Sequence, residues 1–106
     1  MEGWQIEISE FVENDLREEC EYFEQHHSEK YAQQFWKEFY KQVDTILPNP
    51  LKYSECRFLP TKKKGYRNII WGNYLIIYRI KSKVVQVLTL FHTKQHPNKI
   101  KQTRRR

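Results

Sequence analysis

The chain of 106 residues, with 39% hydrophobic and 15% aromatic side chains, is long enough for one packed domain and too apolar for wholesale disorder. It has no apolar run long enough to span a bilayer, and residues 1–4 lack the basic-then-apolar pattern of a secretory signal, so we expect a cytoplasmic protein without membrane contact. The net charge of +6 is unevenly distributed, because residues 1–47 contain twelve acids and four bases whereas residues 48–106 contain one acid and fifteen bases. This segregation predicts an acidic face and a basic face, the latter suited to nucleic acid or to an acidic protein.

The first half of the chain predicts one strand and two helices. Residues 4–8 alternate apolar and polar side chains, as a half-buried strand does. Ser9 and Ser28 are suitable N-caps for helices over residues 10–26 and from residue 29 onward. Apolar side chains recur at helical spacing in both, namely Val12, Leu16, Cys20 and Phe23, then Ala32, Phe35, Phe39, Val43 and Ile46. Because the link between the helices is short, they form an antiparallel hairpin.

The second half predicts a loop and a sheet. Prolines at 48 and 50 end the second helix, a short strand is expected at 56–59, and three strands follow at 66–71, 74–80 and 84–92. Their tight connections, Gly72-Asn73 and the three residues 81–83, make the strands antiparallel neighbours. Residues 98–106 are basic, show no apolar period and are expected to fray, which leaves residues 1–97 as a single domain. The order predicts an α+β fold in which the two helices cover one face of the sheet and the other face is open.

No metal or cofactor site is indicated by the sequence. His26 and His27 are adjacent, but neighbours on a helix point about 100° apart and no third ligand lies near them. Cys20 and Cys56 are expected to be buried, reduced thiols, although a disulfide remains an alternative.

From residue 4 to residue 97 the chain resembles bacterial toxins of the RelE/ParE superfamily, the toxic half of type II toxin–antitoxin pairs. The segments SEFVENDLREECEYF and SEKYAQQFWKEFYKQVDTI are similar to the two helices of that family. The most specific segment is YRNIIWGNYLIIYRIKSKVVQVLTLFHTKQHP, which resembles a strand opening on Gly-x-Arg, a tyrosine-flanked central strand and a last strand closing on histidine. The resemblance implies a cytoplasmic plasmid-stabilisation toxin, neutralised by a cognate antitoxin. We expect it to form either a homodimer or a toxin–antitoxin hetero-oligomer.

The family's activities divide into two classes, and the central strand favours one of them. RelE-like members cleave mRNA on the ribosome and typically place an arginine directly after the first tyrosine of that strand; here the residue is Leu75. ParE-like members inhibit DNA gyrase and commonly have a tyrosine, leucine, isoleucine, tyrosine and arginine pattern, which residues 74–79 match, and a final Leu-x-His, which residues 90–92 match. The resemblance is therefore closer to the gyrase inhibitors, with the mRNA endoribonuclease as the alternative.

Whether the chain is an enzyme is left open by its candidate functional residues. His92 has the right type of side chain for a general acid if the protein is a ribonuclease. Contacts to a target or to nucleic acid are assigned to Arg67, Arg79, Lys94, Lys62, Lys63 and Lys64. A general base is missing, because the basic half contains only Glu55. The same residues would also suit structural roles, or a basic nucleic-acid-binding module without toxicity.

Overall fold

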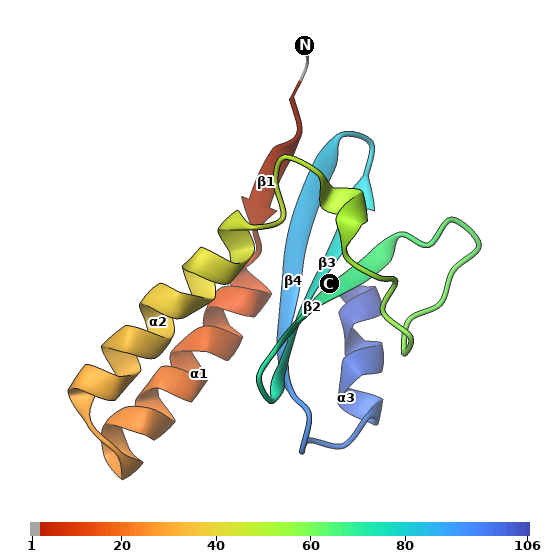
Figure 1. Ribbon diagram of the computed structural model, residues 1–106. Helices are drawn as coiled ribbons and strands as arrows, with labels where there is room; N and C mark the ends of the chain where they lie inside the picture. The colour runs from red at the N-terminus through yellow and green to blue at the C-terminus, as the bar shows by residue number, and fades with distance from the viewer. Residues whose placement is uncertain (1–2) are drawn as a thin grey trace.

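A four-stranded mixed sheet with strand order β1-β4-β3-β2 forms the centre of the computed structural model, which describes residues 3–106. In chain order the elements are β1 (Gln5–Ile8), α1 (Glu10–His26), α2 (Glu29–Asp44), the 3-10 turn η1 (Pro50–Lys52), β2 (Tyr66–Trp71), β3 (Tyr74–Lys81), β4 (Val84–His92), α3 (Asn98–Lys101) and the 3-10 turn η2 (Gln102–Arg105). β1 lies parallel to β4, and β2, β3 and β4 form an antiparallel meander. Figure 1 shows the α1–α2 hairpin on one side of the sheet and α3 on the other. The predicted α+β fold, with its strand, helical hairpin and meander, is confirmed.

The helical hairpin begins where the sequence predicts. Ser9 Oγ accepts a hydrogen bond from the amide of Val12 at 3.1 Å, and Ser28 Oγ accepts one from the amide of Tyr31 at 3.0 Å. Each cap satisfies an amide that would otherwise have no partner in the first turn. α2 ends two residues before Ile46, which is nevertheless fully buried.

The first hydrophobic core lies between this hairpin and the sheet. Its buried members are Val12, Leu16, Phe23, Ala32, Phe35, Phe39, Val43, Ile46, Ile69, Ile76, Tyr78, Val85, Val87 and Leu90. Tyr78 is the largest fully buried side chain, and its hydroxyl donates to the carbonyl of Pro50, which fixes η1 against the core. The predicted helical stripes therefore supply one half of this core and the sheet the other.

A second hydrophobic core covers the sheet face that the sequence analysis left open. Its members are Cys56, Leu59, Tyr66, Leu75, Ile77, Leu88, Phe91 and Ile100. The expectation that residues 98–106 fray is not met, because they form α3 and η2 and bury Ile100 and Thr103 completely. These two side chains are three residues apart, so a helical segment presents both to the sheet. One buried aliphatic residue and one threonine make too short a pattern to be recognised as a helix in the sequence.

The connections within the sheet differ from expectation at two places. The two-residue hairpin between β2 and β3 is not one of them; it is present as predicted, and its Gly72 adopts φ 58°. The next hairpin also has two residues, because Lys81 pairs directly with Val84, and Ser82 takes the left-handed conformation with φ 50°. The short strand expected at 56–59 is instead a turn, and only Glu55 forms an isolated bridge to β2.

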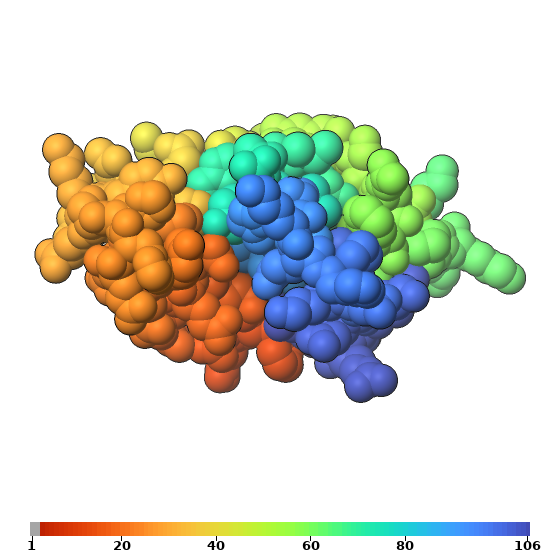
Figure 2. Space-filling model, turned by 90° about the horizontal axis from the view of Figure 1, so that it is seen from below, coloured from red at the N-terminus to blue at the C-terminus, as the bar shows by residue number. Residues whose placement is uncertain are grey.

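The segregation of charge along the sequence becomes a separation in space. Seen from below, the hairpin occupies one end of the molecule, and the C-terminal segment and the loop before β2 occupy the other (Figure 2). Twelve of the thirteen acids belong to residues 1–47, whereas fifteen of the nineteen bases belong to the rest of the chain. One end of the molecule is therefore strongly basic.

Candidate functional site

Arg67 in β2 anchors the loop that precedes this strand. Its Nη1 donates to the carbonyl oxygens of Leu51 at 3.1 Å and Tyr53 at 2.7 Å. Its Nε is buried and has no hydrogen-bond partner within residues 3–106. The side chain therefore holds η1 against the edge of the sheet, and most of its guanidinium faces the protein.

Arg79 in β3 lies on the opposite face, beside the second core. Its Nε and Nη2 donate to Oε1 of Gln86 at 2.9 and 2.6 Å. Gln86 in turn donates to Glu7 at 3.3 Å, and Tyr66 pairs with Arg79 in the register of β2 and β3. A polar row thus crosses all four strands and keeps the guanidinium of Arg79 on the sheet surface.

The predicted lysines are exposed and scattered. Lys62, Lys63 and Lys64 lie in the loop before β2, where Lys64 has φ 53°. Lys94 lies in the turn after β4, which ends opposite Tyr74, whereas the loop before β2 leads into Tyr66, which pairs with Arg79 near the other end of β3. These ammonium groups are free to meet an anionic partner, but they do not surround one point.

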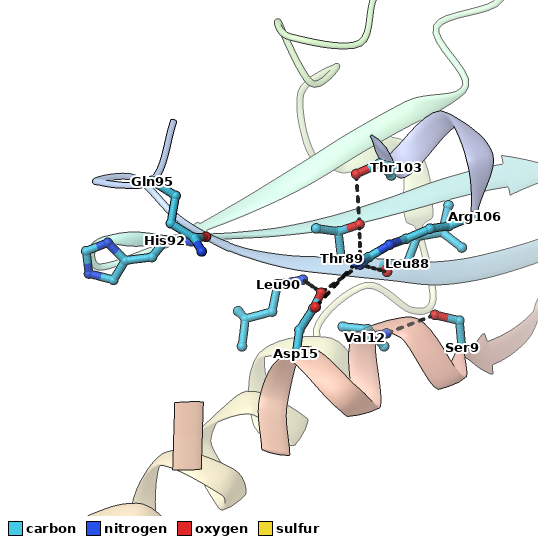
Figure 3. A network of polar contacts seen from close by, with 10 residues as sticks. All are labelled: Ser9, Val12, Asp15, Leu88, Thr89, Leu90, His92, Gln95, Thr103 and Arg106. Carbon is cyan, nitrogen blue, oxygen red and sulfur yellow. Dashed lines mark hydrogen bonds and ion pairs between the residues drawn. The ribbon is translucent and has the colours of Figure 1, made fainter. Parts of the chain in front are cut away.

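His92, at the end of β4, is fixed by its own turn. Its Nδ1 accepts a hydrogen bond from the amide of Lys94 at 3.0 Å, and its own amide donates to Gln95 at 3.1 Å. In neutral His92 the ring proton therefore resides on Nε2. The ring contacts Tyr74 edge-on at a centroid distance of 4.8 Å and points away from the polar network in Figure 3.

Tyr74 brings an acid into this neighbourhood that sequence reasoning missed. Its hydroxyl donates to Oε1 of Glu19 at 2.6 Å, across 55 positions of the chain. Burial and this hydrogen bond both raise the pKa of Tyr74, so its phenol stays protonated. No local pattern could have identified Glu19, because it is one of many acids on α1.

The structure does not bring His92 together with Arg67 or Arg79. Tyr74, the cross-strand neighbour of His92, is five residues from Arg79 along β3, or about 16 Å at the usual strand rise. Arg67 and Arg79 also lie on opposite faces of the sheet. His92 and the two candidate arginines therefore cannot act on one phosphate as they are placed.

A polar cleft of about 280 Å³ opens between α1 and the C-terminal segment. The α1 side of the cleft is acidic, the C-terminal side is polar and basic, and β4 lies between them. The lining residues are Phe11, Asn14, Asp15, Glu18, Glu19, Thr89, Leu90, Phe91, Gln95, Lys99, Gln102 and Arg106. The last pair between β1 and β4 joins Ile8 to Val87, so the cleft lies along the part of β4 that β1 leaves uncovered.

Side chains replace the missing strand along this edge (Figure 3). Asp15 accepts from the amide of Leu90 at 3.1 Å, and Arg106 donates to the carbonyl of Leu88 at 3.1 Å. Arg106 and Asp15 also pair with each other at 2.7 Å. Exposed strand edges need such partners. We call this arrangement of Asp15 and Arg106 the C-terminal latch.

We also searched residues 3–106 for metal ligands, membrane-spanning helices and reactive thiols. Among residues 3–106 no three potential ligands cluster as a metal would require, and no helix in that range is both long and apolar enough to cross a bilayer. Cys20 and Cys56 are free thiols, the first partly exposed and the second buried. Burial raises the pKa of both, which keeps them protonated.

Comparison with known proteins identifies the family. The model for "ParE toxin of type II toxin-antitoxin system, parDE" matches residues 6–97. The chain belongs to the ParE toxin family. A solved structure described as "Chromosomal ParDE TA system from P. aeruginosa" has the same fold, with a TM-score of 0.72 and 14% identity over 86% of this chain and 97% of that one. No match was found among curated proteins.

Two features of this ParE family toxin concern the central strand and the C-terminal segment. Leu75, which follows the first tyrosine of the central strand, is buried in the second core beside Phe91 and Ile100. The position that a ribonuclease of the superfamily would use for an arginine is thus closed to solvent. In addition, α3 and η2 lie beyond the matched residues 6–97.

Proposed function

We propose that this ParE family toxin inhibits growth by binding DNA gyrase and that a cognate antitoxin neutralises it. The proposal rests chiefly on one observation, the separation of His92 from Arg67 and Arg79. Cleavage of a phosphodiester by a ribose hydroxyl needs a base, an acid and cations around a single phosphate. A protein that inhibits by binding needs only a complementary surface, and the basic end of the molecule supplies one.

The contacts to the target are proposed for cations of residues 48–106. Lys94 and the lysines Lys62 to Lys64 are exposed and Arg79 is half-buried, whereas Arg67 contributes mainly by holding the adjacent loop in place. Surface charges of this kind accelerate association and select an acidic partner.

The antitoxin is proposed to cover apolar side chains that the isolated toxin exposes. Phe11, Tyr22, Tyr31, Trp36 and Ile70 are all exposed, four of them on the helical hairpin. Exposed apolar and aromatic side chains of this kind are typical of surfaces that bind another protein. Light scattering on the toxin alone and on toxin mixed with antitoxin distinguishes a homodimer from a toxin–antitoxin hetero-oligomer.

The mRNA endoribonuclease remains the second candidate because of one local arrangement. His92 presents Nε2 outward beside the Tyr74–Glu19 pair, which places a candidate acid near a carboxylate. For this arrangement to cleave RNA, cations would have to be supplied by the ribosome or by movement of Lys94.

The deciding experiment compares DNA supercoiling with mRNA integrity. The toxin is induced in bacteria lacking the antitoxin, and purified toxin is added to a gyrase supercoiling assay with and without antitoxin. We expect growth arrest, a DNA-damage response, intact transcripts and loss of supercoiling in vitro, all reversed by antitoxin. Rapid mRNA cleavage with normal supercoiling would establish the ribonuclease instead, and normal growth at full expression would remove both.

A further inference from the structure

Two arginines from distant parts of the chain contact one tyrosine ring. The guanidinium carbon of Arg79 lies 5.9 Å from the centroid of Tyr66, and that of Arg104 lies 5.7 Å from it. Tyr66 is only 7% exposed and belongs to the second core, so both guanidinium groups contact a buried ring. We call these three residues the arginine pair site.

The positive charges of this site are not neutralised by acids. Within residues 3–106 the only ion pair joins Arg106 to Asp15. The carboxylates of Glu55 and Glu7 form no ion pair with either arginine: Glu55 accepts from the amide of Thr61, and Glu7 accepts from the side-chain amide of Gln86. Like charges gathered without a counter-charge destabilise the folded state, so an anionic ligand would be bound favourably here.

Both guanidiniums retain free donors. Arg79 uses Nε and Nη2 on Gln86, and Arg104 uses Nη2 on the carbonyl of Pro60 at 3.1 Å. Nη1 of each has no hydrogen-bond partner within the described residues, and Arg104 is exposed. The Pro60 contact also holds the loop that contains Arg57, Lys62, Lys63 and Lys64 against the C-terminal segment.

The C-terminal latch positions Arg104. Thr103 bonds to Thr89 at 2.8 Å and is fully buried, and Arg106 pairs with Asp15. Thr103 before Arg104 and Arg106 after it are therefore fixed to β4 and α1. This segment lies beyond residues 6–97, which the family model matches, so the arginine pair site combines Tyr66 and Arg79 from within that range with Arg104 from beyond it.

We propose that the arginine pair site binds the phosphodiester backbone of nucleic acid. Guanidinium groups form paired hydrogen bonds with phosphate oxygens, and neighbouring cations on the loop extend the contact along a strand. Because the Tyr66 ring is buried, it offers no surface on which a base could stack, so binding is independent of sequence. This property goes beyond the proposed inhibition of gyrase and does not depend on gyrase being the target.

The test is a binding titration with fluorescent duplex DNA and single-stranded RNA of mixed sequence, repeated over a range of salt concentrations. Arg79→Gln and Arg104→Gln each should lower affinity about three- to tenfold near 0.1 M salt and reduce the slope of log affinity against log salt by about one. The matched control is the double variant Lys37→Gln, Lys41→Gln on α2, which removes more charge at the other end of the molecule and should change affinity less than about twofold. The relative affinity for DNA and RNA identifies which backbone is preferred.

A variant of the latch separates an organised site from general electrostatic attraction. Asp15→Ala makes the protein more basic, so attraction by net charge alone predicts tighter binding. The arginine pair site predicts weaker binding, because Arg104 is no longer held against the Tyr66 ring that Arg79 also contacts. Circular dichroism checks that each variant is folded. If Asp15→Ala does not fold, Arg104→Gln, which changes an exposed position, still tests the proposal.

Three results would overturn the proposal. These are equal loss of affinity in the α2 control and the arginine variants, tighter binding by folded Asp15→Ala, and binding of poly-glutamate as tightly as nucleic acid of the same charge. Since the readout is binding to nucleic acid alone, none of them affects the supercoiling assay that tests the proposed function.

Discussion

Arg106 donates a 2.7 Å hydrogen bond to Asp15, 91 positions earlier in the chain. Both side chains are 19% exposed, so the pair is partly protected from solvent. Asp15 also accepts from the amide of Leu90, and Arg106 donates to the carbonyl of Leu88. The pair therefore completes the hydrogen bonding of β4 where β1 ends, and it fixes the C-terminal segment to α1.

Removal of this latch should destabilise the protein. Asp15→Ala leaves the amide of Leu90 and the guanidinium of Arg106 without their acceptor, and we expect a loss of about 1–2 kcal/mol in the free energy of unfolding. Urea denaturation measures the loss, and amide hydrogen exchange at Leu90 locates it. Glu18→Ala, an exposed acid on the same helix, is the control and should change stability by less than about 0.5 kcal/mol. Equal effects of the two substitutions would show that the latch has no energetic role.

Truncation of Ile100 should destabilise the C-terminal segment, because this side chain belongs to the second core. It is fully buried in the second core, and Ile100→Ala removes three carbons from that core. We expect a loss of up to about 2–4 kcal/mol, limited by local unfolding of α3 and η2 if those elements detach first. Limited trypsin digestion should then cleave after Lys99 or Lys101 much faster than in the wild type. Lys101→Ala, at an exposed position of the same helix, should leave the stability unchanged.

Stability should fall at alkaline pH because of Tyr78. Burial raises the pKa of Tyr78 above the ordinary value of 10.0, an effect that the nearby charge of Arg67 partly offsets. As the pH rises above 10, the unfolded chain loses the phenolic proton while the folded protein keeps it, so the free energy of unfolding decreases. Tyr78→Phe cannot ionise and should show a shallower decline between about pH 9 and pH 11. At neutral pH the same variant should be about 1 kcal/mol less stable, because it loses the hydrogen bond to Pro50.

Urea denaturation at a series of pH values gives both numbers for wild type and variant. Tyr22→Phe, which removes an exposed phenol from α1, is the matched control. An identical alkaline decline in wild type and Tyr78→Phe would contradict the assignment to Tyr78.

His92 should be dispensable for growth arrest if the toxin acts by binding. His92→Ala removes the contacts to Lys94 and Tyr74, which are local, so the protein should fold and remain toxic. Viable counts after induction, with protein levels checked by immunoblot, measure the result. His92→Gln, which retains a polar side chain, is the comparison. A folded His92→Ala protein without toxicity would favour the ribonuclease alternative, above all if mRNA cleavage is lost with it.

Local signals in the sequence predicted the fold well in the first half of the chain. The caps at Ser9 and Ser28 and the apolar stripes that follow them are short-range features, and the structure has both helices where they indicate. The meander was predicted for the same reason, from strand-like runs separated by tight turns. The C-terminal segment was missed because only Ile100 and Thr103 are buried in it, and their burial depends on the surface that β4 presents.

The candidate site could be predicted only residue by residue. The types and positions of His92, Arg67 and Arg79 were evident, but their separation depends on strand register and on which face each strand turns toward the helices. An irregularity in the pairing of β3 with β4, next to Tyr78, shifts that register further. Glu19 and Arg104, which lie beside Tyr74 and Tyr66, could not be singled out among many similar charges.

The sequence by itself determined the α+β class, the helical hairpin, the ParE-like pattern of the central strand and the segregation of charge. The fold class, the hairpin and the charge pattern follow from interactions within a few residues or from simple composition, because caps, periodicities and turns act locally, whereas the ParE-like pattern is a resemblance to a known family. Only the tertiary structure decided that Arg106 meets Asp15, that the second face of the sheet is covered, and that Arg79 and Arg104 share one ring. These relationships join residues far apart in the chain, and they are set by the packing of α3 and η2 on the sheet, for which no local pattern exists.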